Sequence, residues 1–576
     1  MPLATPPTRF ATCHSILIIC GLVICFLAQA SWFLVANSQT FDEAVHVAAG
    51  YRYLSQQDFQ FNREHPPLTK LLSALPAFLS YDLSEEEESS PISDQWSEGV
   101  EYLYRSPVPA SRLLTGARLS NIALGALLIV VVASWSWHLW GPRGAVFSAA
   151  LLAFDPNIVA HSCLATTDLG AAFFFVATLA FLWSYVSWPR WSTLLIVGSC
   201  LGGALASKFS MVALLPAIGF ILLAYPLATN KSLLPSRSVS DNSISRSTMI
   251  VHSLACVAAM FIVAEFVLWS CYLYGDVSIW LVGVADQWRH QLQGHPAFLL
   301  GAYSSTGWLY YFLVAILVKT PLGTLAAFLF CLAILRGRIR WQAGTALVFI
   351  VPFFVFSMAA CCARTNIGLR YVLPIYALSF VLLGALAAEP KTDWRVLLCW
   401  VLAGATAAES LAVAPHQLSF FNAAVGGPSS GHQYLSDSNL DWGQDLAALS
   451  QWLQQRGNPA IYLSYFGTAP PEYFGIRFQP LPTFNPASNA APPVSLPDAN
   501  QELLAISMVN LQGVYFDDHE LFGWLRTRKP LAEIGHSILV FDLAHDGEAH
   551  ECLARIYEMT GRPDLAQREK QRAHSP

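Results

Sequence analysis

The chain opens with the stretch ILIICGLVICFLAQASWFLVA, residues 16–36, a mainly apolar run that is long enough to cross a lipid bilayer as a helix. Ten further apolar runs follow along the 576 residues. They occupy residues 113–139, 144–162, 169–187, 191–207, 209–228, 249–272, 318–335, 342–360, 371–388 and 396–413. We therefore predict an α-helical polytopic membrane protein with about 11 transmembrane helices.

The overall composition agrees with this class. Of the residues, 54% are hydrophobic and 12% are charged, whereas a soluble domain has about 25% charged residues. The net charge of −6 comes without a basic stripe or an RNA-binding signature, which argues against nucleic acid as a partner. The 12 cysteines lie mostly inside apolar runs and form no Cys-x-x-Cys pair, which favours small core residues over a disulfide framework or a metal site.

The orientation of the chain follows from its basic residues. Ala28-Gln29-Ala30 resembles a signal-peptidase site, but the apolar run continues through Val35 and is too long for a typical signal peptide, so we expect an uncleaved first span. Lysine and arginine occur in alternate short loops, from Arg143 to Arg395, and such residues favour the cytoplasm. This predicts a cytoplasmic N-terminus in the inner (plasma) membrane, with the loop 37–112 and the C-terminal region outside.

A second domain is expected after the last apolar run. From about Ala414 the content of Gly, Pro, Asn and Asp rises and no further span appears. Residues 460–466 and 537–542 have the character of strands, and 445–455 and 550–560 have helical spacing. We predict a transmembrane domain at 1–413 and an extracytoplasmic α/β domain at 414–576, with a mobile loop at 480–497.

Two clusters of reactive side chains lie in the loop 37–112. In Phe41-Asp42-Glu43-Ala44-Val45-His46, the two carboxylates directly follow the first span. A carboxylate at the membrane interface has few waters, is more basic and can accept a proton, although a solvated loop is the alternative. In His65-Pro66-Pro67-Leu68-Thr69-Lys70, the prolines restrict the backbone before an apolar helix. A lysine in the first turn of a helix is unfavourable without an anion, so Lys70 either faces a phosphate or is solvated.

Together, the Phe-Asp-Glu…His and His-Pro-Pro-Leu-x-Lys runs resemble the signature of the protein O-mannosyltransferase family. These enzymes form glycosyltransferase family 39 of the GT-C fold and include bacterial aminoarabinose transferases of lipid A. The resemblance covers roughly residues 10–410. His46 comes three residues after Glu43, whereas the eukaryotic members have His two residues after the Glu. Their extra lumenal domain is also missing, so a bacterial-type member is the better match.

The resemblance implies a donor sugar on a polyprenyl monophosphate. Asp42 matches the residue that acts as catalytic base, and Glu43 would be the neighbour that orients acceptor or donor. His65 and Lys70 would frame the lipid phosphate, whereas the displaced His46 would be a possible substrate contact.

Further cations and one acid have counterparts in the family. Arg364, Arg370 and Tyr371 lie in a non-cytoplasmic loop, against the charge rule, and a guanidinium that binds phosphate explains this better than a structural ion pair. Lys208 either snorkels to the interface or binds the donor. Asp168 caps a helix or faces the acceptor, and Lys319 is a possible contact to the lipid phosphate.

One acidic run, Asp437–Asp445, resembles a calcium loop in acid count but lacks its ligand spacing, so a capped turn is preferred. No metal site or other cofactor is evident, although a divalent ion is not excluded. We predict an inverting glycosyltransferase that moves a sugar from a polyprenyl-phosphate donor to a protein, lipid or glycan acceptor. The alternative is a transporter or flippase of lipid-linked sugars, which often shows internal repeats that this chain lacks.

Overall fold

The structure is a computed structural model, and it describes residues 9–83, 94–235, 245–338, 342–388, 393–484 and 502–574. Most of the chain is a bundle of apolar helices. The helices of this bundle are α1 (Arg9–Ala36), α5 (Ala110–Ala153), α6 (Pro156–Ser162), α7 (Asp168–Ser187), α8 (Trp191–Leu205), α9 (Leu214–Thr229), α10 (Arg246–Cys271), α12 (Tyr311–Lys319), α13 (Leu322–Arg338), α14 (Ala343–Cys362), α15 (Leu373–Leu383) and α16 (Asp393–Val413). The core between them holds large side chains such as Phe26, Phe175 and Phe380, all of which are fully buried.

The predicted class, a polytopic helical membrane protein, is confirmed, but the number of spans differs. Among the described residues, eight helical stretches are long and apolar enough to cross a membrane, and nine if α12 and α13 form one span bent by 117°. The predicted runs 113–139 and 144–162 lie in α5 and α6, and α5 breaks at Gly141, whose φ of +79° is followed by Pro142. The run 191–207 is the short α8 of 15 residues. Hydropathy alone does not distinguish a straight membrane-spanning helix from a broken or a short helix, because all three bury apolar side chains.

The break between α12 and α13 has a local cause. Pro321 lies between the two helices and has no N–H to donate to a preceding turn. The two apolar segments therefore cannot continue as one straight helix, and the predicted run 318–335 covers the end of one and most of the other.

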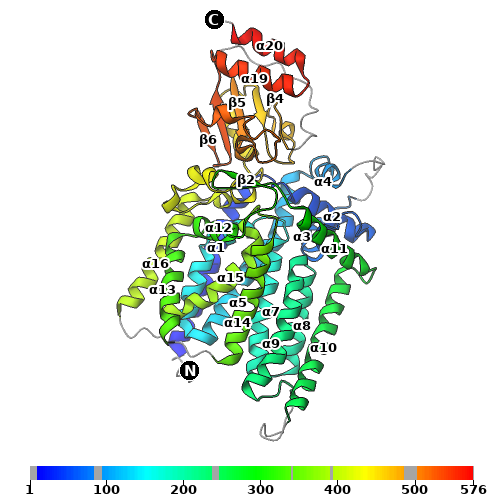
Figure 1. Ribbon diagram of the computed structural model, residues 1–576, viewed down its shortest axis with the longest axis vertical. Coiled ribbons are helices and arrows are strands. Elements are labelled where there is room, and N and C mark those ends of the chain that lie inside the picture. The colour runs from blue at the N-terminus through cyan, green and yellow to red at the C-terminus, as the bar shows by residue number, and fades with distance from the viewer. Residues whose placement is uncertain are drawn as a thin grey trace.

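A layer of short helices covers one end of the bundle. It contains α2 (Glu43–Gln56), α3 (Leu68–Ser80), α4 (Gln95–Tyr104) and α11 (Ser278–Gln293). These helices lie at the end of the bundle that is nearer the C-terminal domain, and the N-terminus lies at the opposite end of the bundle (Figure 1). The loop 37–112 is thus largely folded, and both of its motifs lie at the end of the bundle.

The C-terminal domain contains a five-stranded sheet with the order β4-β3-β5-β7-β6. Its strands and helices are β3 (Ile461–Ser464), β4 (Phe478–Pro480), β5 (Leu503–Ser507), β6 (Ala532–Ile534), β7 (Ile538–Asp542), α17 (Leu446–Gln454), α18 (Met508–Gln512), α19 (Gly547–Met559) and α20 (Pro563–Ala573). Strand β3 pairs in parallel with β4 and β5, whereas β7 pairs antiparallel with β5 and β6. The predicted strands at 460–466 and 537–542 and both predicted helices are present. A separate hairpin, β1 (Ala297–Leu299) and β2 (Ala302–Ser304), precedes α12.

The segment after α16 remains attached to the membrane helices. Lys319 Nζ donates to Leu418 O at 2.8 Å, and Asn422 Nδ2 donates to Leu317 O at 2.7 Å. Because these contacts continue as far as Gln444, we propose that the soluble fold begins near α17 rather than at residue 414. Of the loop predicted at 480–497, residues 485–497 lie outside the described part of the chain.

Candidate active site

Four of the predicted site residues meet in one cluster of ion pairs. Asp42 immediately precedes α2, and Arg370 lies in the 3-10 turn before α15. Arg370 Nη1 is 3.0 Å from Asp42 Oδ2 and 3.7 Å from Asp168 Oδ2. Lys208 Nζ pairs with the other carboxylate oxygen of Asp168. We call Asp42, Asp168, Lys208 and Arg370 the charged cluster.

Two aromatic rings hold the cations of the charged cluster. Tyr371 lies under both of them, with its ring centroid 4.5 Å from Lys208 Nζ and 5.5 Å from Arg370 Cζ. The Trp442 ring lies 4.1 Å from Arg370 Cζ. Such contacts are favourable in a desolvated site because the face of an aromatic ring is negative.

The guanidinium of Arg370 uses only some of its hydrogen-bond donors. Arg370 Nε is buried and has no hydrogen-bond partner among the described residues. Leaving such a donor unpaired costs about 1–3 kcal/mol. Asp42, with 18% of its side chain exposed, is the most accessible member of the cluster. An anionic oxygen that reaches this point would satisfy Arg370 and lie next to Asp42.

His46 and His65 lie beside the charged cluster, and burial disfavours the charged form of each imidazole. Their rings meet edge to face with centroids 5.6 Å apart, and His46 Nδ1 is 3.2 Å from Ala165 O. Burial lowers the pKa of His46 to about 4 and lowers the pKa of His65 well below its ordinary value. His65 Nδ1 has no partner among the described residues. Nδ1 of His65 is therefore available for a hydrogen bond to a ligand.

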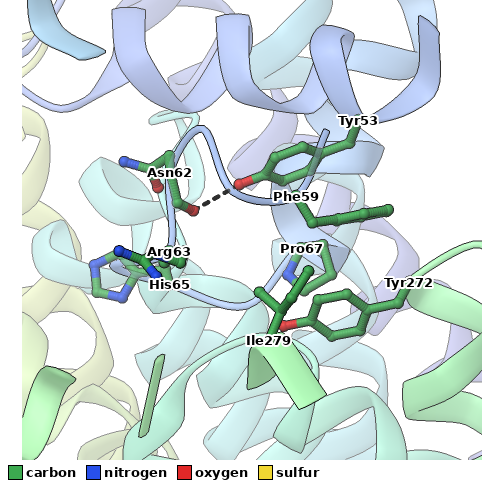
Figure 2. Close-up of a pocket in the computed structure, with 8 residues that line it drawn as sticks. All are labelled: Tyr53, Phe59, Asn62, Arg63, His65, Pro67, Tyr272 and Ile279. Carbon is green, nitrogen blue, oxygen red and sulfur yellow. Dashed lines mark hydrogen bonds between the residues drawn. The ribbon is translucent and has the colours of Figure 1, made fainter. Parts of the chain in front are cut away.

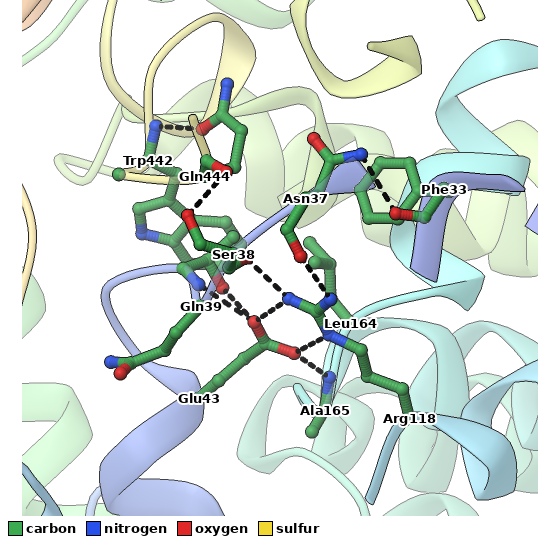
Figure 3. Close-up of polar contacts among 12 residues, drawn as sticks. Phe33, Asn37, Ser38, Gln39, Glu43, Arg118, Leu164, Ala165, Trp442 and Gln444 are labelled. Atoms are coloured by element: carbon green, nitrogen blue, oxygen red, sulfur yellow. Dashed lines mark hydrogen bonds and ion pairs between the residues drawn. The ribbon is translucent and has the colours of Figure 1, made fainter. Parts of the chain in front are cut away.

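Glu43 has a different environment from the one that the sequence suggests. Its side chain is fully buried, and Arg118 Nε and Nη2 donate to its two oxygens at 2.8 and 2.6 Å. The N–H groups of Thr40 and Ala165 donate to it at 2.8 Å each (Figure 3). Burial raises the pKa of Glu43, but the charge and hydrogen bonds of Arg118 outweigh this and the net pKa lies below its ordinary value. Glu43 therefore has no face toward a substrate, contrary to the expected contact with acceptor or donor.

Arg118 was not among the residues predicted for the site. It also donates to the carbonyls of Asn37 and Ser38, and thus holds the backbone just before Asp42. A charged residue five positions inside the apolar run 113–139 is costly unless it is paired. That signal was available in the sequence and would have identified it.

Three predicted cations donate hydrogen bonds to residues outside the charged cluster. Lys70 Nζ donates to Asn62 O at 2.9 Å and to His65 O at 2.8 Å, and burial lowers the pKa of Lys70 to about 7. Lys319 Nζ holds the carbonyls of Leu418 and Asn439. Arg364 is exposed and donates to Leu292 O at 2.8 Å. Backbone carbonyls accept hydrogen bonds from the buried ammonium groups of Lys70 and Lys319, whereas Arg364 makes one such bond and is otherwise exposed.

A pocket adjoins His65, and its lining side chains are drawn in Figure 2. It is lined by Tyr53, Phe59, Asn62, Arg63, His65, Pro67, Tyr272 and Ile279.

Within the described residues no group of three or more His, Cys, Asp or Glu side chains could hold a metal ion. The charged cluster itself offers the carboxylate of Asp42 beside two cations, Arg370 and Lys208.

The chain was compared with known families and structures. Residues 111–238 match the family model described as dolichyl-phosphate-mannose-protein mannosyltransferase. This segment contains Arg118, Asp168 and Lys208, whereas Asp42 and Arg370 lie outside it. A search of the curated proteins finds no significant match.

The solved structures include several with a distant likeness. ArnT from Cupriavidus metallidurans bound to undecaprenyl phosphate has 13% identity and a TM-score of 0.47, with 91% of this chain and 97% of that chain covered. The Archaeoglobus fulgidus oligosaccharyltransferase has 12% identity and a TM-score of 0.42, with 78% and 59% covered. The S. cerevisiae Pmt1-Pmt2 complex with its sugar donor has 19% identity and a TM-score of 0.35, with 48% and 35% covered. Because each TM-score is below 0.5, we base no functional assignment on these likenesses.

The family match covers part of the region in which the motifs predict the resemblance. It is independent of the Asp42 and His65 motifs, since neither lies within residues 111–238. The predicted resemblance is confirmed over these residues, and the chain is a polytopic helical protein with a segment similar to the dolichyl-phosphate-mannose-protein mannosyltransferases.

Proposed function

We propose that the chain transfers a sugar from a polyprenyl-phosphate donor to a protein, lipid or glycan acceptor, with Asp42 as the catalytic base. The observation that carries this proposal is the pairing of Asp42 with Arg370 at 3.0 Å. Arg370 has a further buried donor, Nε, with no partner in the described part of the chain. A base for the acceptor and a cation for the leaving phosphate are thus adjacent.

The reaction is a single displacement. Asp42 removes the proton from the acceptor's hydroxyl or amine group. The acceptor's oxygen or nitrogen attacks the anomeric carbon of the donor sugar at the same time. The bond between that carbon and the phosphate oxygen breaks, and its electron pair leaves with the lipid phosphate. Because attack and departure are on opposite faces, the anomeric configuration inverts.

Arg370 and Lys208 are suited to stabilise the departing phosphate. Both contact the Tyr371 ring and pair with Asp42 or Asp168, so the charged cluster sets two basic side chains against two carboxyl groups before the donor binds. When the donor phosphate arrives, it competes with Asp42 for Arg370 and releases the carboxylate toward the acceptor. Cations that face the developing charge lower the barrier because little reorganisation is needed.

The charged cluster is proposed to face the extracytoplasmic side of the membrane. It lies at the end of the bundle next to the C-terminal domain, opposite the N-terminus. The basic residues Arg143, just after the kink of α5 at Gly141, and Arg190, in the loop before α8, lie in chain segments that alternate with those of the site, as expected for the cytoplasmic side. A lipid-linked donor in the outer leaflet would then meet the site at the membrane surface.

The test is transfer by purified protein in membranes, with tritiated polyprenyl-phosphate mannose as the first donor. Asp42→Asn keeps the shape of the side chain but removes the base, so we expect transfer to fall by about 10²- to 10⁴-fold. Asp58→Asn is the control, since Asp58 pairs with Arg52 at 2.9 Å in the same loop. It should transfer at the wild-type rate.

Two outcomes would contradict the proposal. Undiminished transfer by the Asp42→Asn protein would exclude Asp42 as the base. Movement of intact labelled lipid across the bilayer, with no sugar transferred to an acceptor, would favour the alternative, a transporter or flippase.

A further inference from the structure

The segment Ser436–Asp445, which we call the bridging segment, contacts the loop that carries Arg370. Ser438 Oγ donates to Ile367 O at 2.7 Å, and the N–H of Leu369 donates to Asn439 Oδ1 at 3.0 Å. Gly368 approaches Ser438 so closely that a Cβ there would lie 2.3 Å from its Oγ. The backbone on the N-terminal side of Arg370 is therefore tied to the bridging segment.

The same segment contacts the loop that carries Asp42. The N–H of Phe41 donates to Trp442 O at 2.8 Å, and the N–H of Ser38 donates to Gln444 O at 2.8 Å. Trp442, Gln444 and Ser38 lie together in Figure 3, beside Glu43. Since the two loops come from distant parts of the chain, the bridging segment fixes their distance from each other.

The bridging segment is itself anchored to the membrane helices. Lys319 Nζ, at the end of α12, donates to Asn439 O, and Asn439 Nδ2 donates to Tyr311 OH at 3.0 Å. Ser419 Oγ donates to Leu440 O at 2.7 Å. Lys319 therefore acts on the site through this segment rather than by facing the lipid.

Trp442 is the residue of this segment that contacts the charged cluster. Its side chain is 2% exposed, and its ring lies 4.1 Å from Arg370 Cζ. Asp42 holds Nη1 of the same guanidinium at 3.0 Å. The contacts with Trp442 and Asp42 together fix the orientation of the guanidinium. They leave its Nε, which has no hydrogen-bond partner among the described residues, available for an oxygen of the donor phosphate.

We propose that Trp442 is a positioning residue for phosphate binding by Arg370, so that the C-terminal part of the chain completes the site at the end of the helix bundle. This rests on the proposed function, because it requires that Arg370 binds the lipid phosphate. Trp442 acts on the donor through Arg370, and it neither touches the acceptor nor takes part in proton transfer.

The experiment measures binding of radiolabelled undecaprenyl phosphate to the purified full-length protein in lipid nanodiscs. Loss of a desolvated cation–π contact corresponds to about a 10- to 30-fold change in affinity, so Trp442→Leu should raise Kd by that factor. Trp442→Phe keeps an aromatic face and should restore Kd to within about threefold of the wild type. A purely structural role predicts less folded protein instead, with an unchanged Kd.

Trp452→Leu is the matched control. The ring of Trp452, on α17, lies 3.8 Å from Cζ of Arg456, which follows that helix, so this change also removes a cation–π pair from the C-terminal region. Neither residue belongs to the charged cluster, and Kd for undecaprenyl phosphate should stay at the wild-type value.

A double variant separates this inference from the proposed function. Arg370→Gln should weaken binding strongly, and adding Trp442→Leu to it should change Kd by less than about twofold, because residues that act as a unit are not additive. If Arg370→Gln binds normally, the phosphate contact in the proposed function is wrong. If Arg370→Gln weakens binding but Trp442→Leu does not, or if the two losses add fully, the positioning role of Trp442 is wrong while the proposed function stands.

Discussion

Adjacent carboxylates in this protein have opposite environments. Asp42 is partly exposed and makes one ion pair with Arg370. Glu43 is fully buried and accepts hydrogen bonds from Arg118, Thr40 and Ala165. Both residues are acids at neighbouring positions, so the difference comes entirely from what packs around them. Only Asp42 is available to a substrate, and Glu43 fixes the loop that presents it.

Glu43→Gln tests this structural role. Removing one partner of a buried pair leaves the Arg118 charge uncompensated, so we expect a loss of about 3–5 kcal/mol in unfolding free energy. Thermal unfolding of the purified protein, followed by tryptophan fluorescence, measures it. Glu101→Gln is the control, because Glu101 pairs with Arg105 at 3.2 Å with both side chains more than half exposed. It should cost less than about 1 kcal/mol, and an equal loss in both variants would refute a special role for Glu43.

At the scale of the elements, close helix packing positions the loops of the site. Helix α2 packs against both α3 and α4. Gly50 of α2 lies at the contact with α3, and Gly99 of α4 lies at the contact with α2. A Cβ on Gly50 would lie 2.0 Å from Lys70 O, and one on Gly99 would lie 2.8 Å from Val45 Cα. The backbones are thus nearly in contact, which keeps the start of α2, and Asp42 with it, in one place.

Gly50→Ala should therefore destabilise the protein, although alanine is the better helix former. The clash with the α3 backbone costs about 1–3 kcal/mol, which exceeds the gain of at most about 1 kcal/mol in helix propensity. Gly404→Ala in α16 is the control, since a Cβ there meets nothing within 4 Å. Thermal unfolding should separate the two variants, and equal stability would show that α2 and α3 can move apart freely.

At the scale of the whole molecule, the charged cluster is the meeting point of distant segments. Asp42 and Arg370 are 328 positions apart in the chain, and the Gln39–Thr468 hydrogen bond joins positions 429 apart. Aromatic rings add to this contact, since Phe41 stacks on Phe466 with centroids 5.3 Å apart. The soluble domain and the membrane bundle are therefore expected to unfold together around the site.

The stability of this assembly should depend on pH through His46. Burial lowers its pKa to about 4, from an ordinary 6.5. Between these values the unfolded chain binds more protons than the folded one, so stability is complete above about pH 6.5 and falls as the pH decreases to about 4. The shift corresponds to a loss on the order of 3 kcal/mol. Unfolding temperatures measured from pH 7 to pH 4 should fall less steeply in His46→Gln.

The exposed His138 provides the comparison for that measurement. His138→Gln should follow the wild-type curve over the whole pH range. If His46→Gln also follows it, another buried group governs the acid sensitivity.

The amino-acid sequence by itself determined the class of this protein and most of its parts. Apolar runs identify membrane helices because the cost of exposing them to water, or of burying charge in lipid, is local to each segment. The same local reasoning identified the strands at 460–466 and 537–542, and it singled out Asp42, Asp168, Lys208 and Arg370 as separate residues.

Only the tertiary structure decided what these residues do together. It brought Arg370 to Asp42, buried Glu43 on Arg118, directed Lys70 and Lys319 to backbone carbonyls, and placed Trp442 on the Arg370 guanidinium. The physical reason is that the protonation, exposure and partners of a charged group depend on every segment that packs around it. Those segments lie hundreds of residues apart, and no local pattern encodes their contact.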